Sequence, residues 1–144
     1  MAKRKKQIKT RSTLEDRVIA SLEAMKAKFE YETLKIMYQK KPSSYRPDIV
    51  LDNGIIVEIK GYFDAEDRAK HLLIKEQHPE LDIRFVFQDS RKKIHKSSTT
   101  TYGDWADAKG FIYADKEIPS EWVREAGDKK QVLPYRKPRL RRTT

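Results

Sequence analysis

The sequence predicts one α/β domain in which a mixed β-sheet is flanked by helices. Three features point to this fold: a β-hairpin over residues 47–60, a strand–helix–strand run that ends near residue 88, and an amphipathic helix near the N-terminus. A helix that follows a strand and precedes another suggests a crossover connection. With 144 residues, of which 38% are hydrophobic, the chain can bury one core of its own.

Caps, apolar spacing and turn residues place the elements along the chain. Ser12 or Thr13 caps a helix over residues 14–28, in which apolar residues recur every three or four positions. Residues 29–38 alternate as a strand with an irregularity, and residues 40–44 form a polar connector that can be extended rather than folded back. After the hairpin we expect a helix over 65–77 capped by Asp64, a strand over 81–88, a helix over 102–109 that ends at Gly110, a strand over 111–114 and a helical turn from Pro119.

The register of the hairpin decides which side chains share a face of the sheet. A two-residue turn at Asn53-Gly54 would pair Asp48 with Ile59 and place Glu58 on the opposite face. A three-residue turn over residues 52–54, with a left-handed glycine, pairs Asp48 with Glu58. We predict the second register because it segregates the apolar side chains better. Its faces carry Ile49, Leu51, Ile55, Val57 and Ile59 on one side, and Asp48, Val50, Ile56, Glu58 and Lys60 on the other.

Two carboxylates and an ammonium on one otherwise apolar sheet predict a metal-dependent phosphodiesterase. Asp48 and Glu58 offer hard oxygen ligands, and the backbone carbonyl of Ile59 is a further ligand; such oxygens favour magnesium or manganese. Lys60 would orient or deprotonate the attacking water, or offset developing charge. The structural alternative is that Asp48 caps a strand and Glu58 pairs with Lys60. A bound cation is favoured because apolar neighbours make an unneutralised Asp–Glu pair costly.

The remaining candidate residues have both a structural and a functional interpretation. The spacing Ser12-x-x-Glu15 favours a capping box for Glu15. None of the three histidines has metal-ligand spacing, although His71 near a helix start can contact phosphate. The first interpretation of the basic residues is that they are solvated surface charges. As phosphate contacts they would instead position the substrate without reading its bases. The residues that we assign to such contacts are Lys3, Arg4, Lys5, Lys6, Arg11, Arg68, Lys70, His71, Lys92 and Lys93.

The formal charge of +10 belongs to the two ends of the chain. Residues 1–11 carry six Lys or Arg and no acid, residues 128–144 carry seven against one Asp, and residues 12–127 have a net charge of −2. We therefore expect a basic arm, a single domain and a basic tail over these three ranges, with the ends suited to a polyanion such as nucleic acid. The absence of cysteine excludes disulfides and thiolate chemistry. No apolar run approaches the length of a bilayer span, so we expect a soluble intracellular protein.

Pro47-Asp48 followed by Glu58-Ile59-Lys60 resembles the signature of the PD-(D/E)xK nuclease superfamily. Longer runs resemble the endonuclease I family of T-odd bacteriophages, which resolves four-way DNA junctions; these runs are residues 12–16, 71–84, 101–103, 114–116 and 118–122. The resemblance implies a restriction-endonuclease-like core in an intertwined, domain-swapped homodimer. Residues 12–39 would be exchanged, residues 40–45 would be the bridge and residues 46–127 the core. Glu15 would then join the catalytic and metal-binding residues from the partner chain.

The same resemblance implies a magnesium-dependent, structure-selective endodeoxyribonuclease that resolves four-way (Holliday) junctions and other branched DNA by paired nicks. Manganese should substitute for magnesium, with two ions per site. The expected partners are branched DNA and a second copy of the chain, without a membrane or a small-molecule substrate, and a phage protein would act in the host cytoplasm. Two alternatives stay open: a catalytically silent protein that binds branched DNA, and a site-specific restriction nuclease, for which the small core leaves little room to read bases.

Overall fold

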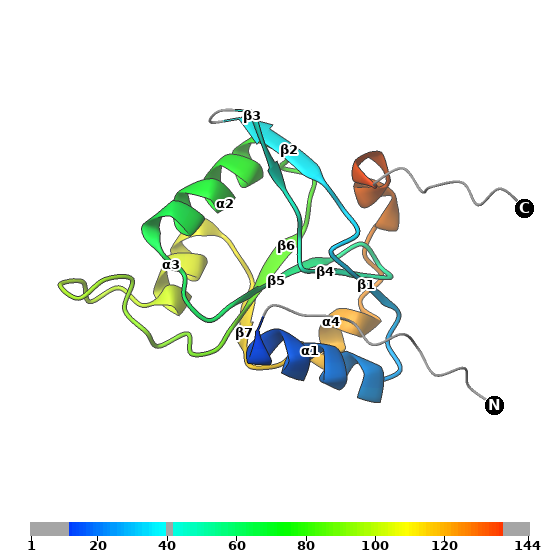
Figure 1. The fold of residues 1–144 in the computed structure, drawn as a ribbon, viewed down its shortest axis with the longest axis horizontal. Helices are drawn as coiled ribbons and strands as arrows, with labels where there is room; N and C mark the ends of the chain where they lie inside the picture. Colours follow the sequence, from blue (N-terminus) through cyan, green and yellow to red (C-terminus); the bar gives the residue numbers. More distant parts are fainter. Residues whose placement is uncertain (1–11, 40–41, 137–144) are drawn as a thin grey trace, which may run out of the picture.

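The computed structural model describes residues 12–39 and 42–136, in which a central sheet lies between helices (Figure 1). The elements over these residues are α1 (Thr13–Ala24), β1 (Phe29–Tyr31), β2 (Ile36–Gln39), β3 (Pro42–Tyr45), β4 (Ile49–Leu51), β5 (Ile56–Lys60), α2 (Ala65–Gln77), β6 (Ile83–Phe87), α3 (Tyr102–Lys109), β7 (Tyr113–Asp115), α4 (Ser120–Arg124) and the 3₁₀ helix η1 (Lys129–Tyr135). In that part of the chain, no helix is long and apolar enough to cross a membrane.

The central sheet is mixed, with the strand order β1-β4-β5-β6-β7. β4 runs antiparallel to β1 and β5, whereas β5, β6 and β7 run parallel to one another. α2 connects the parallel strands β5 and β6, which confirms the predicted crossover. α2 and α3 cover one face of the sheet, α1 and α4 cover the other, and each face buries its own apolar cluster (Figure 1). The predicted α/β class, a mixed sheet flanked by helices, is therefore confirmed.

The β4–β5 hairpin has the predicted three-residue turn. Val50 lies opposite Ile56, and this register places Asp48 opposite Glu58. Gly54 has a φ of +89°, a conformation that glycine adopts without steric cost. The hairpin side chains buried beneath α1 and α4 are those of the predicted apolar face: Ile49, Leu51, Ile55, Val57 and Ile59.

Two elements near the N-terminus end earlier than the sequence predicts. α1 ends at Ala24 instead of near residue 28, and Lys26 just beyond it has a φ of +54°. The strand expected over residues 29–38 is two strands in different sheets, and Glu32 between them has a φ of +52°. A left-handed residue cannot continue a helix or a strand, so each of these residues turns the chain.

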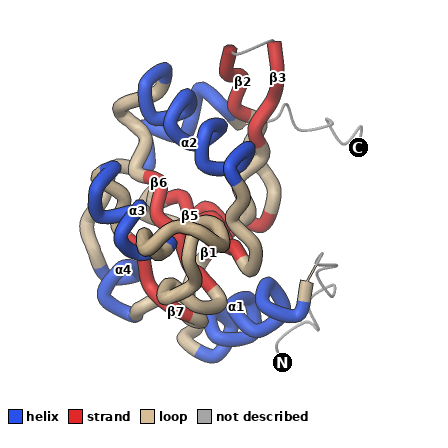
Figure 2. The backbone as a smooth tube through the Cα atoms, turned by 90° about the vertical axis from the view of Figure 1, so that its left-hand side faces the viewer, coloured by secondary structure: helices blue, strands red, loops and turns tan. Residues whose placement is uncertain are grey.

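The connector after β2 folds back within the single chain. β3 pairs antiparallel with β2, and this two-stranded sheet rises beside α2 (Figure 2). The extended connector allowed for by the sequence is thus a hairpin strand over residues 42–45, while residues 40 and 41 lie outside the described residues. An exchanged dimer would require this hairpin to open.

The segment predicted to be a basic tail begins with an ordered turn of helix. η1 buries Val132, which is 1% exposed. The Tyr135 hydroxyl donates a hydrogen bond to Glu80 at 2.7 Å, and Arg136 forms an ion pair with Glu30. Within the predicted basic tail, residues 128–136 are therefore ordered against the domain, where apolar side chains interrupt the basic run. The arm over residues 1–11 and the end of the tail over residues 137–144 lie outside the described residues.

Candidate active site

Asp48 lies immediately before β4 and is only 2% exposed. Its Oδ2 accepts a hydrogen bond from the Ile59 amide at 2.8 Å, and its backbone carbonyl accepts one from the Glu32 amide at 2.8 Å. The amide and carbonyl of one strand residue point to the same side of the strand, so the Ile59 carbonyl also faces Asp48.

Three carboxylates converge at Asp48. Glu15, Glu32 and Asp48 each offer one oxygen, and these oxygens lie within 4.8 Å of one another. The Glu15 carboxylate accepts hydrogen bonds from the Ser12 and Tyr31 hydroxyls, while the Ser12 hydroxyl caps α1 by accepting from the Glu15 amide at 3.1 Å. Glu15 thus belongs to the cap and to the cluster at once. In this structure it reaches Asp48 within one chain, whereas the resemblance implies a contribution from the partner chain.

Glu58, which is 4% exposed, is surrounded by a hydroxyl and an ammonium instead of by other carboxylates. Its Oε2 accepts a hydrogen bond from the Tyr45 hydroxyl at 2.8 Å, and its Oε1 lies 3.5 Å from Lys60 Nζ. The same Lys60 ammonium lies 3.5 Å from Asp67 Oδ1 on α2. The ion pair of the structural alternative is therefore present. It does not account for the convergence of the buried Asp48 and Glu15 with the half-buried Glu32.

Burial sets the electrostatics of this site. Burial and then the charge of Glu58 raise the pKa of Asp48 to about 8, against the hydrogen bond from Ile59. Burial also raises the pKa of Glu58, although Lys60 and the Tyr45 hydroxyl act in the opposite direction. Burial lowers the pKa of Lys60, but the carboxylates around it outweigh this effect and keep the pKa above its usual value. Lys60 is therefore an ammonium ion at neutral pH.

The donor chemistry of the cluster fits a divalent cation. The oxygens within 4.8 Å of one another all belong to carboxylates, which are the hard ligands that divalent cations such as magnesium and manganese favour. Burial, the charge of Glu58 and, to a smaller extent, the charge of Glu15 raise the pKa of Asp48, so ionised carboxylates are costly at this place. A bound cation would remove that cost. Of the predicted ligands, Glu15 and Asp48 belong to the cluster, and Glu58 lies beside it without being a member.

Three residues of the site were missed in the sequence. Glu32 stands in a run expected to be a regular strand, and only its left-handed backbone turns it toward Asp48. Tyr31 and Tyr45 each donate a hydrogen bond to a carboxylate of the site; the sequence analysis placed Tyr31 in an ordinary strand and Tyr45 in the bridge over residues 40–45. Contacts over 13 to 16 residues of sequence leave no local signal that would identify them.

The structure corrects one of the expected DNA contacts and gives another a structural role. His71 is fully buried, and its ring packs against Tyr45 and Phe85 with centroid distances of 5.1 and 4.9 Å. It cannot reach phosphate in this fold, because the helix face that carries it points into the core. Arg68 donates to the Phe63 carbonyl at 2.8 Å, so it tethers the start of α2 to the chain that precedes it.

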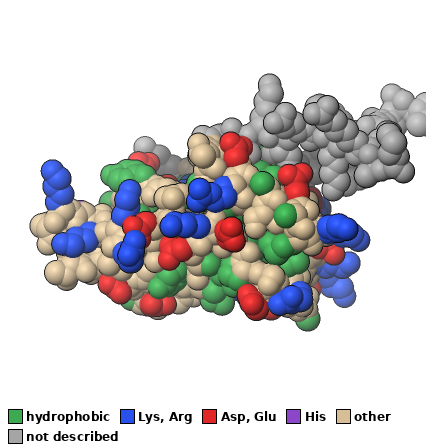
Figure 3. All heavy atoms as spheres, turned by 90° about the horizontal axis from the view of Figure 1, so that it is seen from below, with side chains coloured by type: hydrophobic (Ala, Val, Ile, Leu, Met, Phe, Trp, Pro, Cys, Tyr) green, Lys and Arg blue, Asp and Glu red, His purple; other side chains and the backbone are tan. Residues whose placement is uncertain are grey.

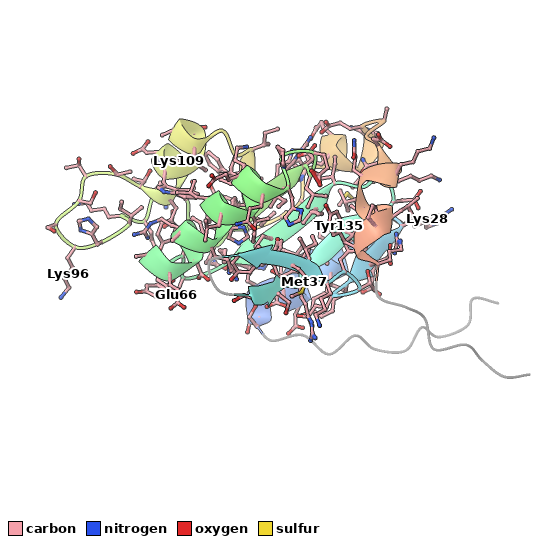
Figure 4. All side chains as sticks on the ribbon, turned by 90° about the horizontal axis from the view of Figure 1, so that it is seen from above. Lys28, Met37, Glu66, Lys96, Lys109 and Tyr135 are labelled. Carbon is pink, nitrogen blue, oxygen red and sulfur yellow. The ribbon has the colours of Figure 1, made fainter. Side chains whose placement is uncertain are left out.

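Other basic residues remain accessible. Lys92 and Lys93 are exposed in the loop between β6 and α3, whose tip carries Lys96 and projects away from the body (Figure 4). Lys70 Nζ lies 3.9 Å from Asp67 Oδ1. The face seen from below carries Lys and Arg interspersed with Asp and Glu instead of one continuous positive patch (Figure 3). The arm residues Lys3, Arg4, Lys5, Lys6 and Arg11 lie outside the described residues.

Comparison with known proteins identifies the family. The model of the phage endonuclease I family matches residues 1–139. The chain belongs to the phage endonuclease I family. Among its relatives, Endonuclease I of Escherichia phage T7 is 52% identical over 124 residues, which cover 85% of this chain and 82% of the relative. Endodeoxyribonuclease 1 of Enterobacteria phage T3 is 50% identical over 129 residues, which cover 88% and 83%.

Proposed function

We propose that this protein is a magnesium-dependent, structure-selective endodeoxyribonuclease that resolves four-way junctions and other branched DNA by paired nicks. The observation that carries the proposal is the buried carboxylate cluster at Asp48, with the Lys60 ammonium beside it on the next strand. Family membership supports an endonuclease, and the name of the phage T3 relative specifies DNA. The choice of branched DNA rests on the resemblance described above.

Glu15, Glu32, Asp48 and Glu58 would hold the metal. When bound, a divalent cation supplies Lewis-acid stabilisation of the phosphorus centre and an acidified water. Since magnesium is usually bound through one or two carboxylates, four carboxylates suit two ions per site. Lys60 remains protonated between two carboxylates, so its role is to offset negative charge on the phosphate rather than to accept a proton.

Phosphate contacts are proposed for the loop that follows β6. Lys60 at the end of β5 lies opposite Phe87 at the end of β6, and the Gln88 amide donates to the Lys60 carbonyl at 3.0 Å. The loop with Lys92 and Lys93 therefore leaves the sheet beside the site. Contacts there would position the DNA backbone for cleavage without reading sequence.

The test is cleavage of a labelled four-way junction and of its linear duplex arms, with magnesium and with calcium. The wild-type protein should give paired nicks near the branch point in magnesium. Asp48→Asn, which has the same shape and lacks the charge, should bind the junction without cutting it. Glu76→Gln removes an exposed carboxylate on α2 and should cut as the wild type does. Junction binding without cleavage by the wild type would leave a DNA-architecture protein, and preference for one base sequence would indicate a restriction nuclease.

We propose that the active species is a homodimer that exchanges residues 12–39, which carry α1, β1 and β2. Two chains related by a two-fold axis present two sites, as paired incisions require. Exchange would preserve the contact of Glu15 with Asp48 but make it between chains. The β2–β3 hairpin, whose connection lies next to the exchanged segment, would be the part that opens.

Mixing two inactive variants distinguishes exchange from a plain dimer. In an exchanged heterodimer of Glu15→Gln and Asp48→Asn, one site carries both substitutions and the other carries neither. Refolding the variants together should then restore single nicks, at about a quarter of the wild-type number of sites if pairing is random. Without exchange every site carries one substitution, and the mixture stays inactive.

A further inference from the structure

Tyr45 connects the β2–β3 hairpin to the proposed metal site. It is the last residue of β3, it stands three residues before Asp48, and it is 2% exposed. Its hydroxyl donates a hydrogen bond to Glu58 Oε2 at 2.8 Å. The other oxygen of that carboxylate, Oε1, lies 3.5 Å from Lys60 Nζ. The two oxygens of Glu58 thus face two different donors, and together these define the plane of the carboxylate.

The ring of Tyr45 is itself held in place. The His71 ring meets it edge-on, with centroids 5.1 Å apart at an interplanar angle of 86°. Lys70 Nζ lies over the ring, 5.6 Å from its centroid. Neither nitrogen of His71 has a hydrogen-bond partner among the described residues, so its contact with Tyr45 is one of packing. A ring enclosed in this way leaves its hydroxyl little freedom to move away from Glu58.

We propose that Tyr45 is a positioning residue whose hydroxyl fixes the Glu58 carboxylate in the orientation that binds the divalent cation. This inference rests on the proposed metal-dependent function. A phenol is protonated at neutral pH, so the Tyr45 hydroxyl is a hydrogen-bond donor to Glu58. The same chemistry recurs at the acidic cluster, where the Tyr31 hydroxyl donates to Glu15. Groups that orient metal ligands commonly tune metal affinity in this manner.

Tyr45→Phe removes the hydroxyl and keeps the ring. Tyr135→Phe is the matched control, since the Tyr135 hydroxyl also donates to a carboxylate, that of Glu80, at 2.7 Å. Tyr135 contacts His78 at the C-terminal end of α2, whereas Asp67 beside Lys60 lies near the other end. Eleven residues of helix separate these two positions, which corresponds to about 16 Å. In Figure 4, Glu66 and Tyr135 lie toward opposite ends of α2.

The first readout is calorimetric titration of manganese into the DNA-free protein. Tyr45→Phe should raise the dissociation constant about 10- to 100-fold, which is the usual effect of losing a group that orients a metal ligand, and Tyr135→Phe should leave it unchanged. Junction cleavage by Tyr45→Phe should require correspondingly more manganese and recover at saturation. An unchanged dissociation constant for Tyr45→Phe, with or without a lower melting temperature, would overturn the inference.

A double-mutant cycle tests whether Tyr45 acts through Glu58. In a Glu58→Gln background the tyrosine hydroxyl no longer orients a charged ligand, so Tyr45→Phe should cause no further loss of manganese affinity. An equal loss in both backgrounds would overturn the inference. Because the Glu58→Gln background removes the buried charge, the comparison within that background stays measurable if Tyr45→Phe alone folds poorly, and a further loss of affinity there would overturn the inference. Since the titrations need no DNA, failure of the wild type to cut a junction would count against the proposed function and not against Tyr45.

Discussion

The two halves of the candidate site differ in how their carboxylates are surrounded. In the Glu58 half, a phenol and an ammonium lie against the carboxylate, at 2.8 and 3.5 Å. In the Asp48 half, the ligand atoms that lie within 4.8 Å of one another all come from carboxylates. The chain itself places a cation beside Glu58, whereas at Asp48 burial and the charge of Glu58 raise the pKa to about 8. This difference identifies the Asp48 half as the part of the fold that a cation would complete.

The largest effect should come from removing the Lys60 ammonium, which lies in the Glu58 half. Lys60→Met should lower junction cleavage by about 10²- to 10³-fold, because the ammonium offsets charge on the phosphate in the transition state. Manganese binding should persist, since the acidic cluster is untouched. Single-turnover cleavage beside a calorimetric titration measures both quantities, with Lys109→Met at the exposed end of α3 as the control. Full cleavage activity of Lys60→Met would contradict this prediction, because the Glu58 half would then contribute no ammonium to the cleavage reaction.

Ionisation of Asp48 should destabilise the metal-free protein as the pH rises. The pKa of Asp48 is about 8 in the folded state and about 4 when unfolded, so the folded state holds one more proton between these values. Stability should therefore fall as the pH rises through this window, by up to about 1.4 kcal/mol per pH unit. Asp48→Asn should remove part of this slope and raise the melting temperature above pH 7.

Denaturant unfolding between pH 7 and 8.5 checks this prediction. In that range His71 adds no opposing slope, because burial lowers its pKa well below the usual value and the unfolded histidine is also neutral. Asp52→Asn, at an exposed position in the hairpin turn, is the control and should leave the slope unchanged. A slope that is identical in the wild type and Asp48→Asn would show that Asp48 does not carry the excess charge.

The far end of the hairpin should matter for stability alone. Asn53 in the turn donates hydrogen bonds to the carbonyls of Trp122 and Glu125, at 2.8 and 2.9 Å. Asn53→Ala should cost about 1 to 2 kcal/mol of unfolding free energy, since it leaves these carbonyls without that donor. Manganese affinity and cleavage at low temperature should match the wild type. A change in metal affinity would show that the turn and the site are coupled through the strands.

The smallest effect should lie outside both halves, at the loop after β6. Lys92→Ala and Lys93→Ala should each reduce the salt dependence of junction binding by roughly 0.9 in the logarithmic slope if each side chain contacts one phosphate. The cleavage rate of the bound junction should not change. Binding titrations over a range of potassium chloride concentrations measure the slope, and an unchanged slope would remove this loop from the DNA interface.

Local signals predicted much of the fold. The caps and stop signals placed α2 and α3 at their observed bounds, and the turn over residues 52–54 fixed the register that sets Asp48 opposite Glu58. These features depend on a few neighbouring residues, which is why the sequence contains them. Within the site, Asp48, Glu58 and Lys60 came from that register, and Glu15 came from the family resemblance.

The features that escaped prediction depend on distant contacts. The burial of His71 and the packing of Val132 in η1 require the assembled core. The turn at Glu32 and the hydrogen bond from Tyr45 to Glu58 follow from the way β1, β3 and β5 come together. Periodicity within a single segment does not indicate such contacts. The sequence analysis therefore assigned Glu15 and Asp48 to the site but not Glu32.

The most direct test of the account is calorimetric titration of manganese into the metal-free wild type, Asp48→Asn and Glu32→Gln. If the Asp48 half is the metal site, the wild type binds, Asp48→Asn loses most of its affinity, and Glu32→Gln is weakened although the sequence alone did not assign it to the site. The exposed control Glu76→Gln should bind as the wild type does. Wild-type affinity in Asp48→Asn would contradict the account, because the buried cluster would then not be what holds the cation.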